Sequence, residues 1–355
     1  MRAFGVCQVT FAFESMMDLL AVKLGMDPLE LRLANALVDG DTNCAGVRLV
    51  TSTGVAGCLE ILRDHPFWQD RGEWQRQAPP GTRRGVGLAT VFNAAGYGGG
   101  VRDSAIAKVE LCPDGKITVH NAVSDMGQGN SSAFLQMAGH VLGQEASSMI
   151  LRQPDTVTAY PSGSSSAGRT TYTYGNALTK ACEELKARII NRAGLLLFID
   201  SDKDLRLVPG KVIHPPSSRE VPLERLASFM PREDRVCISQ YVAPVCEEVP
   251  DTATGFFIGF PHVIFAYGAH LARVQVDLST GVIRVLDYLA ATDGGRVVNP
   301  AMFDQQVHGG VGQGLGYALT EDLVTHEGRV MSRDLGTYLV PGAMDVPDIV
   351  SIPYH

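Results

Sequence analysis

Two distant stretches of the sequence carry the same alternation of apolar and polar residues on both sides of a short turn. Residues 105–111 and 116–123 alternate around a Pro-Asp-Gly turn. Residues 269–278 and 282–290 alternate around a Ser-Thr-Gly turn. Alternation that flanks a glycine-containing turn is typical of a β-hairpin. The chain is therefore expected to form at least two antiparallel strand pairs.

The segments that follow the two hairpins are also alike. Gly-Gln-Gly stands at 127–129 after the first hairpin and at 312–314 after the second, near the helix-like runs 131–142 and 304–319. We interpret the two regions as a diverged internal repeat, although hairpins are common enough for the likeness to arise by chance. The expected fold class is α+β, with two related modules of mixed or antiparallel sheet and flanking helices. In a true repeat, the two Gly-Gln-Gly elements can face one site from opposite sides.

Other segments are expected to complete these modules. Residues 11–24 place Phe13, Met16 and Leu20 on one helical face, and Asp27 is positioned to cap a second helix. Residues 40–84 look irregular. The expected domains are 1–80, a helical hairpin and irregular segment completing the first module; 81–200, the first hairpin and Gly-Gln-Gly module; and 201–355, the second hairpin and Gly-Gln-Gly module.

Composition narrows the functional classes. The chain has 355 residues, 45% of them hydrophobic and 19% charged, which is ordinary for a globular protein. The formal charge of −8 argues against general nucleic-acid binding, and no apolar run has membrane-spanning length. The seven cysteines form no Cys-x-x-Cys pair, so we expect reduced thiols, a cytoplasmic protein and no iron–sulfur cluster on this chain.

The segment Gly127-Gln128-Gly129 has the glycines of an anion-binding turn but no lysine or arginine. Glycines allow the backbone to approach a ligand, and a following helix offers N–H groups to an anion. The Gln128 amide both donates and accepts hydrogen bonds. The P-loop and Rossmann patterns are absent. A tight turn before a helix requires the same residues, so the motif alone does not define a site.

A run of three serines, Ser164, Ser165 and Ser166, is the second candidate. A small-residue loop of this kind can surround a phosphate or a flat polar heterocycle, and it can equally be a flexible linker. Arg169 and the helical pattern that follows argue against a linker, but both interpretations stay open on the sequence alone. Gln313 is the third candidate, because a polar side chain in a glycine-rich apolar stretch is costly without a partner.

The order of several segments resembles the molybdopterin-binding subunit of the xanthine oxidase/aldehyde oxidoreductase family of molybdenum hydroxylases. The similarity extends from residue 2 to about 349, and it rests on the joint order of its motifs. These motifs, in order, are "RAFGVCQ", "FAFESMMDLLAVKLGMDPLELRLANAL", "DMGQG", "DTVTAYPSGSSSAGRTTYTYGNAL", "DGGRVVNPAMFDQQVHGGVGQGLGYALTEDL" and "YLVPGAMDVPDI".

The resemblance implies roles for the candidate residues. It implies that a pyranopterin cofactor is held by backbone and neutral amides. The implied cofactor-binding residues are Ala3, Gly127, Gln128, Gly129, Ser164, Ser165, Ser166 and Gln313. Gln313, Arg2 and Phe4 are the implied catalytic residues, with Phe4 packing on an aromatic substrate. No residue of this chain is expected to ligate the metal.

The resemblance also implies the reaction and the assembly. The family hydroxylates an electron-poor carbon with water as the oxygen donor, and electrons leave through iron–sulfur clusters to a flavin. The expected substrate is an N-heterocycle of the purine, xanthine or nicotinate type, or an aldehyde. The expected cofactor is molybdopterin, as its cytosine dinucleotide, with molybdenum. The 2Fe-2S clusters and FAD are expected on partner chains, namely an iron–sulfur subunit and a flavin subunit. A third expected partner is the N-terminal half of the molybdenum subunit, on another chain.

Three departures from the family pattern bear on activity. The general-base glutamate of the family lies in a Gly-Glu motif beyond the Asp-Val-Pro segment at 345–347, and the family's upstream half has no counterpart here. Val6-Cys7 stands where Gly-Pro is usual, and Asp125 stands near the position of a glutamate. Three interpretations remain open, of which two keep the family: an enzyme active only in a multi-chain complex, and a catalytically silent, cofactor-holding or structural relative. An unrelated nucleotide-binding protein is a third.

Overall fold

The chain forms two compact units in the computed structural model, which describes residues 2–3, 5–98, 101–200, 202–246 and 262–354. Unit 1 comprises residues 1–44, 48–93 and 265–355, and unit 2 comprises residues 45–47 and 94–264. Neither unit coincides with one of the three segments expected from the sequence. Unit 1 joins the two ends of the chain, so its core depends on contacts between residues far apart in sequence.

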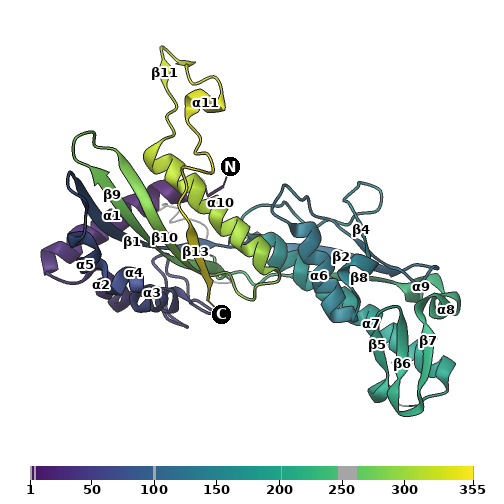
Figure 1. Ribbon diagram of the computed structural model, residues 1–355. Coiled ribbons are helices and arrows are strands. Elements are labelled where there is room, and N and C mark those ends of the chain that lie inside the picture. The colour runs from purple at the N-terminus through teal and green to yellow at the C-terminus, as the bar shows by residue number, and fades with distance from the viewer. Residues whose placement is uncertain (1, 4, 99–100, 201, 247–261, 355) are drawn as a thin grey trace. The chain divides into compact units, whose positions relative to one another are not determined.

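Unit 2 is built on a four-stranded sheet with the strand order β4-β3-β2-β8 (Figure 1). Strand β2 is antiparallel to β3 and to β8, whereas β3 is parallel to β4. The β2–β3 pair confirms the first predicted hairpin. The strands are β2 (Ser104–Leu111), β3 (Ile117–His120), β4 (Ile150–Arg152) and β8 (Val236–Val242).

Two helices pack with this sheet. Helix α6 (Asn130–Leu142) buries Phe134 and Leu142, and helix α7 (Gly175–Leu197) follows a π-helical turn at Thr170–Tyr174. The sequence predicts helices over residues 131–142 and 175–198, and both are confirmed within one residue at each end. A three-stranded sheet and two short helices complete the unit: β5 (Arg206–Val208), β6 (Lys211–His214), β7 (Arg219–Pro222), α8 (Leu223–Ser228) and α9 (Arg232–Arg235).

Unit 1 contains the second four-stranded sheet, with the strand order β1-β9-β10-β13. Strands β9 and β10 are antiparallel, which confirms the second predicted hairpin, and β10 is parallel to β13. Helix α10 (Pro300–Leu319) lies between β10 and β13 in the chain. The strands are β1 (Thr82–Ala94), β9 (Phe265–Asp277), β10 (Ile283–Asp293) and β13 (Ile349–Pro353).

The N-terminal helices of unit 1 were only partly predicted. The Asp27 carboxylate accepts hydrogen bonds from the backbone N–H groups of Leu29 and Glu30, so the predicted cap is confirmed. The expectation that residues 40–84 are irregular is wrong, because they contain three helices and the first three residues of β1. The helices are α1 (Val6–Leu24), α2 (Pro28–Ala34), α3 (Val55–Asp64), α4 (Pro66–Gln69) and α5 (Arg71–Arg76).

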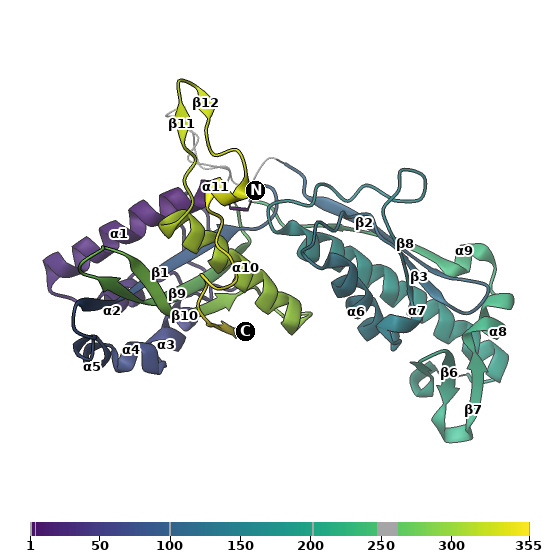
Figure 2. The ribbon, with the colours of Figure 1, turned by 45° about the horizontal axis from the view of Figure 1, so that its top comes forward.

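An extended arm leaves unit 1 after α10. It contains β11 (Thr325–His326), β12 (Arg329–Val330) and α11 (Leu335–Tyr338). Figures 1 and 2 both show this arm standing away from the sheet of unit 1. No residue of its three elements is buried, so the arm has no core of its own.

The two sheets have the same connectivity. In each, an antiparallel hairpin leads into a helix, and the next strand of the same sheet pairs parallel to the second hairpin strand: β2-β3-α6-β4 in unit 2 and β9-β10-α10-β13, with the arm inserted before β13, in unit 1. A strand from elsewhere in the chain flanks the first hairpin strand on its other side, β8 or β1. This shared connectivity agrees with the predicted internal repeat.

Candidate cofactor-binding site

The first Gly-Gln-Gly element is a loop that joins β3 to α6 in unit 2. Gly127 and Gly129 have φ values of 102° and 85°, which L-residues rarely adopt. The Asp125 carboxylate accepts hydrogen bonds from the N–H groups of Gly127 (3.0 Å), Gly129 (3.3 Å) and Ser131 (2.9 Å). These bonds, that from Ser131 first, hold the pKa of Asp125 below its ordinary value of 3.8. The loop is therefore fixed by its own carboxylate.

These hydrogen bonds limit the groups with which the loop can bind a ligand. The sequence suggested that backbone N–H groups here receive an anion, yet those of Gly127 and Gly129 donate to Asp125. A carboxylate at the start of α6 already complements the helix dipole and repels a second anion. A phosphate held by these two N–H groups is thus inconsistent with the loop as it is folded. The loop can instead offer its exposed surface and the Gln128 side chain.

Gln128 belongs to the same hydrogen-bond system. Its Nε2 donates to the Ser124 carbonyl at 3.1 Å, and its Oε1 accepts from the Met126 N–H at 2.5 Å. A primary amide nitrogen carries two hydrogens, so one donor of Gln128 is left after the bond to Ser124. A Cβ added at Gly127 would meet no atom within 4 Å. The space beside Gly127 is therefore open for a ligand to approach the backbone.

The serine-rich loop lies directly against this element. Ser165 Oγ donates to the Ser124 carbonyl at 3.1 Å, which joins the two loops. Ser164 Oγ lies 2.6 Å from the Tyr97 hydroxyl and 2.7 Å from Ser166 Oγ. Ser164 and Ser166 are exposed, so both hydroxyls are accessible. The hydrogen bond with Ser164 is the main cause of a lowered pKa at Tyr97.

Arg169 anchors the serine-rich loop from beneath. Its side chain is 2% exposed and is paired with Asp103, which is 1% exposed, at 2.6 Å. The guanidinium also donates to the carbonyls of Ser162 and Ser164. A Cβ at Gly163 would lie 2.6 Å from the guanidinium, so only glycine fits there. The loop is thus held in one conformation, and a flexible linker is excluded for it.

The predicted site residues of unit 1 form a second group. Gln313 Nε2 donates to the Arg2 carbonyl at 3.3 Å and to the Tyr317 hydroxyl at 2.9 Å. The Arg2 guanidinium donates to the Gln306 side chain at 2.7 Å. Ala3, between Arg2 and the turn into α1, has a φ of 53°. The structure therefore brings the N-terminal motif to α10, more than 300 residues away, while Phe4 lies outside the described residues.

The second Gly-Gln-Gly element differs from the first. Residues 312–314 lie within helix α10, and neither glycine has a positive φ. The sequence placed residues 312–314 in the helix-like run 304–319, which the structure confirms, so the second element is not a loop like the first. Helical N–H groups in the middle of a helix are already bonded to carbonyls one turn back. Gln313 offers its side chain only.

The groups in unit 2 fit a polar ligand that is gripped mainly by uncharged groups. The accessible donors are two serine hydroxyls, a tyrosine hydroxyl and a glutamine amide. Asn130, the first residue of α6, has a buried amide nitrogen with no hydrogen-bond partner among the described residues. A pyranopterin presents a flat heterocycle with several donors and acceptors, and this donor set suits such edges. The chemistry of the loops thus fits the cofactor implied by the sequence.

Two residues of this site were not proposed as site residues from the sequence. Tyr97 lies in the glycine-dense segment 92–103, whose composition does not single out the tyrosine. Asp125 was noted only as a departure from a family pattern. The signal for Asp125 was its spacing: an aspartate two residues before a glycine can bond that residue's N–H, as in an Asx turn.

A family model described as "Molybdopterin cofactor-binding domain" matches residues 61–347, and a second model with the same description matches residues 1–36. The xanthine dehydrogenase molybdenum-binding subunit of Escherichia coli O157:H7 is 30% identical over 361 residues, which cover 99% of this chain and 46% of that protein. The aldehyde oxidoreductase of Megalodesulfovibrio gigas is 32% identical over 325 residues, 90% of this chain and 32% of that protein.

The fold agrees with these matches. The solved aldehyde oxidoreductase from Desulfovibrio gigas superimposes with a TM-score of 0.78 at 30% identity, covering 99% of this chain and 36% of that one. The chain belongs to the molybdenum-binding subunits of the xanthine dehydrogenase/aldehyde oxidoreductase family of oxidoreductases. It spans less than half the length of these relatives.

The described residues contain neither a metal-binding cluster nor a membrane-spanning helix. No cluster of three or more His, Cys, Asp or Glu side chains able to hold a metal ion occurs among them. Their helices also include none that is long and apolar enough to cross a membrane.

Proposed function

We propose that this chain is the cofactor-holding part of a molybdenum hydroxylase, and that its serine-rich and Gly-Gln-Gly loops bind the molybdopterin. One observation carries this proposal. Arg169 and Asp103 hold the serine-rich loop rigidly, Ser165 ties it to the Gly-Gln-Gly loop, and the hydroxyls of Ser164 and Ser166 stay accessible. Rigid placement of polar groups lowers the entropic cost of ligand binding.

In this proposal the residues of unit 2 have different tasks. Ser164 and Ser166 contact the polar edges of the cofactor, and Ser165 positions one loop on the other. Gln128 contributes its remaining amide donor. Gly127 and Gly129 allow the turn and leave room for the ligand. Asp125 does not contact the cofactor. Its carboxylate stabilises the conformation of the loop.

The residues of unit 1 take part as well. The Gln313 amide and the backbone at Ala3 contact the cofactor, since both belong to the segment where the N-terminal motif meets α10. Arg2 is assigned to substrate binding, and Phe4, which lies outside the described residues, keeps the role that the family resemblance implies for it. The glycines of α10 suit this task, because their lack of side chains exposes the helix surface around Gln313.

Bound molybdenum and its pterin supply two-electron transfer with oxygen from water. The chain's own residues bind and orient the cofactor. We propose a small-molecule substrate, either an N-heterocycle of the purine, xanthine or nicotinate type or an aldehyde. Relatives named for xanthine and for aldehydes are equally similar, at 30% and 32% identity. The cytosine dinucleotide form, and partner chains with 2Fe-2S clusters, FAD and the rest of the molybdenum subunit, complete the proposed complex.

The serine hydroxyls provide the direct test. The native complex is purified with Ser164→Ala/Ser166→Ala in this chain, and bound molybdenum and pterin are measured. We expect several-fold less of both, with an unchanged melting temperature. Ser228→Ala, which removes an exposed serine of the same unit outside these loops, is the matched control. Equal molybdenum in all three proteins would contradict the proposal.

A measurement of oxidation activity distinguishes an active hydroxylase from a catalytically silent relative. Dye reduction by the complex is measured with xanthine, nicotinate and an aromatic aldehyde. Turnover of one of them identifies the substrate class. A complex that contains stoichiometric molybdenum and oxidises none of the three would instead support a catalytically silent, cofactor-holding subunit.

A further inference from the structure

The side-chain amide of Gln313 in unit 1 is held by its nitrogen. Its Nε2 lies 3.3 Å from the backbone carbonyl oxygen of Arg2 and 2.9 Å from the hydroxyl oxygen of Tyr317. A carbonyl oxygen accepts hydrogen bonds and cannot donate one, so the amide atom that faces Arg2 is the nitrogen and not the oxygen. The contact with Arg2 therefore determines which way the amide is turned.

Both hydrogens of this nitrogen are used within unit 1. A primary amide nitrogen carries two hydrogens. One is donated to the Arg2 carbonyl and the other to the Tyr317 hydroxyl. The group of Gln313 that remains for a ligand is the carbonyl oxygen Oε1. Gln313 can therefore offer a ligand an acceptor but no donor.

Gln128 in unit 2 differs from Gln313 in this respect. Its Oε1 accepts from the Met126 N–H, and its Nε2 gives one hydrogen to the Ser124 carbonyl. The second hydrogen of that nitrogen stays available, so Gln128 keeps a donor. The glutamines of the two Gly-Gln-Gly elements thus offer different hydrogen-bonding groups.

Tyr317 reaches Gln313 because the two residues lie four positions apart on helix α10. Side chains at positions i and i+4 lie on the same face of a helix, and a long side chain leans back over the turn before it. Gly314 has open space where a Cβ would stand, so no side chain crowds the pair from that position. The helix therefore places the hydroxyl beside the amide.

Arg2 is fixed on the same helix by a second contact. Its guanidinium donates to the side-chain oxygen of Gln306 at 2.7 Å and to the Gln306 carbonyl at 3.2 Å. Gln306 precedes Gln313 by seven residues, which is about two helical turns. The Arg2 carbonyl is therefore held over Gln313 whether or not position 317 carries a hydroxyl.

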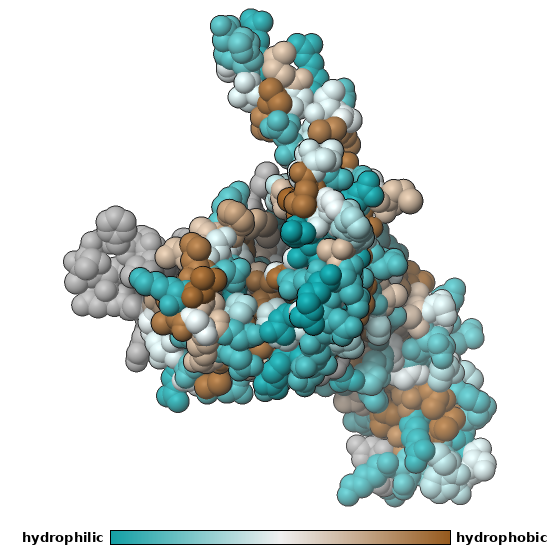
Figure 3. Space-filling view, turned by 60° about the vertical axis from the view of Figure 1, so that its left-hand side comes forward, coloured by the Kyte–Doolittle hydropathy of each residue, from teal (hydrophilic) through white to brown (hydrophobic). Residues whose placement is uncertain are grey.

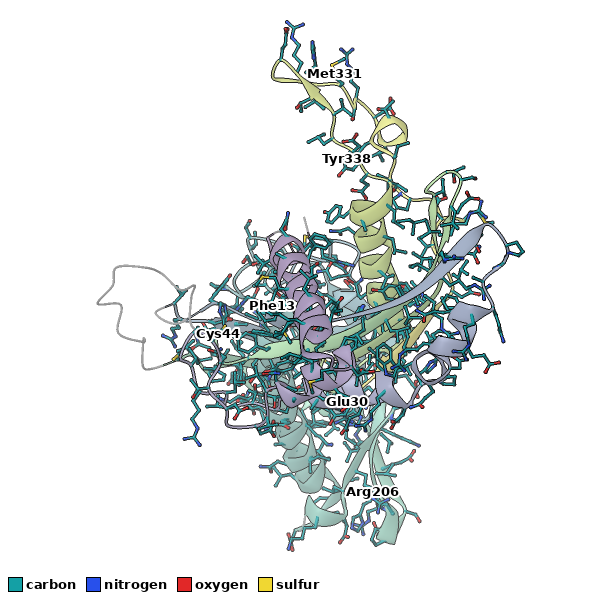
Figure 4. The ribbon with its side chains drawn as sticks, turned by 90° about the vertical axis from the view of Figure 1, so that its left-hand side faces the viewer. Phe13, Glu30, Cys44, Arg206, Met331 and Tyr338 are labelled. Atoms are coloured by element: carbon teal, nitrogen blue, oxygen red, sulfur yellow. The ribbon has the colours of Figure 1, made fainter. Side chains whose placement is uncertain are left out.

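The surroundings of Tyr317 leave it accessible. Its side chain is 44% exposed, and the arm that follows α10 stands away from the body of unit 1 (Figure 3). A second tyrosine, Tyr338, lies on this arm, which continues from the C-terminal end of α10 (Figure 4). A hydrogen bond to Glu321 is the main cause of a raised pKa at Tyr338. The Tyr338 hydroxyl thus has a partner other than Gln313.

We propose that Tyr317 is a positioning residue that fixes Gln313 as a hydrogen-bond acceptor, and that the cofactor meets Gln313 with an N–H donor. The inference rests on the proposed function, in which Gln313 contacts the molybdopterin. A pterin carries ring and amino N–H groups, and Oε1 accepts from one of them. Without the Tyr317 hydroxyl, one hydrogen of Nε2 is unpaired and the amide is held less firmly, which raises the entropic cost of binding.

Substitutions at position 317 test the polarity of this pair. The rate of pterin release is measured for the native complex with Tyr317→Phe, Tyr317→Glu and Tyr317→Lys, and Tyr338→Phe is the matched control. We expect release about two- to tenfold faster for Tyr317→Phe, the effect of one hydrogen bond. Tyr317→Glu restores an acceptor four residues after Gln313 and should stay within about twofold of the wild type. Tyr317→Lys can only donate, so it should occupy Oε1 and release pterin faster than Tyr317→Phe.

Charge alone predicts the reverse order. A dinucleotide cofactor is anionic, so it would be attracted by a lysine and repelled by a glutamate. Slower release with Tyr317→Lys than with Tyr317→Glu would therefore overturn the proposal. So would equal release from Tyr317→Phe and Tyr338→Phe. Melting temperatures should not change, because position 317 is partly exposed.

A crystal structure of the native complex tests the orientation of the amide directly. Gln313 Oε1 should lie within about 3.2 Å of a nitrogen of the cofactor. The bonds from Nε2 to Arg2 and Tyr317 should persist. An amide nitrogen turned toward the cofactor and away from the Arg2 carbonyl would contradict the proposal.

The proposed function fails in a different way. A wild-type complex without molybdenum and pterin would contradict the proposed function and this inference together. Pterin that is held by the wild type, lost from Ser164→Ala/Ser166→Ala and released equally by all variants at position 317 would contradict the inference alone.

Discussion

The two hairpin modules share a connectivity but differ in the helix that follows the hairpin. In unit 2, α6 buries Phe134, Ala138 and Leu142 in a core shared with α7. In unit 1, α10 buries only Val311 and Gly316 along its 20 residues. The same chain order therefore produces a closed core in one module and a largely exposed, glycine-rich helix in the other. The order of strands and helix therefore does not determine how much of the helix is buried.

The Gly-Gln-Gly elements differ for a local reason. In unit 2 the Asp125 carboxylate collects three N–H groups and holds Gly127 and Gly129 in the left-handed region. No aspartate or glutamate stands just before Gly312, and the tripeptide continues a helix that Asn299 caps. One nearby carboxylate thus distinguishes a loop with two glycines of positive φ from a helical turn.

The largest expected difference between the modules concerns their arginines. Arg169→Met leaves the Asp103 carboxylate buried and unpaired, so the free energy of unfolding of unit 2 should fall by about 3–5 kcal/mol. Arg2→Met in unit 1 removes an exposed side chain and should change the free energy of unfolding by less than about 0.5 kcal/mol. Denaturant unfolding of both variants checks this.

A double variant makes the comparison specific. Asp103→Asn in the Arg169→Met background removes the uncompensated charge and should recover part of the lost stability. A double variant no more stable than Arg169→Met would show that the ion pair is not the cause. An Arg2 variant as unstable as Arg169→Met would remove the contrast between the two modules.

The next difference concerns two histidines on the hairpin strands. Burial lowers the pKa of His270 on β9 to about 4, and it also lowers the pKa of His120 on β3, where Glu110 at 3.1 Å opposes the shift. A histidine whose pKa is lowered by folding stabilises the protein fully above 6.5, and this stability is lost as the pH falls toward the folded pKa.

Unit 1 should therefore lose more stability than unit 2 between pH 6.5 and 4, by roughly 2–3 kcal/mol from His270. His270→Gln should flatten the pH dependence of the melting temperature more than His120→Gln does. Thermal unfolding across this pH range measures both. An equal effect of the two substitutions would refute the distinction between His120, which is paired with a carboxylate, and His270, whose hydrogen-bond partner is the uncharged hydroxyl of Tyr288.

Alanine in the two glycine motifs should have opposite effects. Gly127→Ala forces a side chain into a positive-φ position and should destabilise unit 2 by about 1–2 kcal/mol. Gly314→Ala places a better helix former at a position with no atom within 4 Å and should stabilise unit 1 by about 1 kcal/mol. Melting temperatures of the two variants test the sign, and the same sign for both would contradict the assigned conformations.

Local patterns made much of the fold predictable. Both hairpins, α6, α7 and α10 follow from alternation, turn residues and apolar periodicity, which act over a few residues. Strand β1 was missed because its partner β9 lies some 170 residues later, and no local pattern encodes that pairing. Helix α3 was missed although Val55, Cys58, Leu59 and Leu62 recur at helical spacing and are buried.

The site was predictable in its residue types and less so in its geometry. The serine run and Gln128 were identified because such uncharged groups suit a polar ligand. The role of Asp125 depends on a loop conformation. The outward direction of the apolar face of α1, on which Phe13 and Met16 are exposed, depends on what surrounds the helix. Neither property is contained in residue spacing.

Gln128 provides the most direct measurement of the central claim. The native complex is purified with wild-type chain and with Gln128→Ala, and molybdenum and pterin are determined per chain, with circular dichroism to verify folding. We predict stoichiometric molybdenum in the wild type and several-fold less in the variant at unchanged helical content. Full molybdenum occupancy in the folded variant would contradict the assignment of this loop to the cofactor.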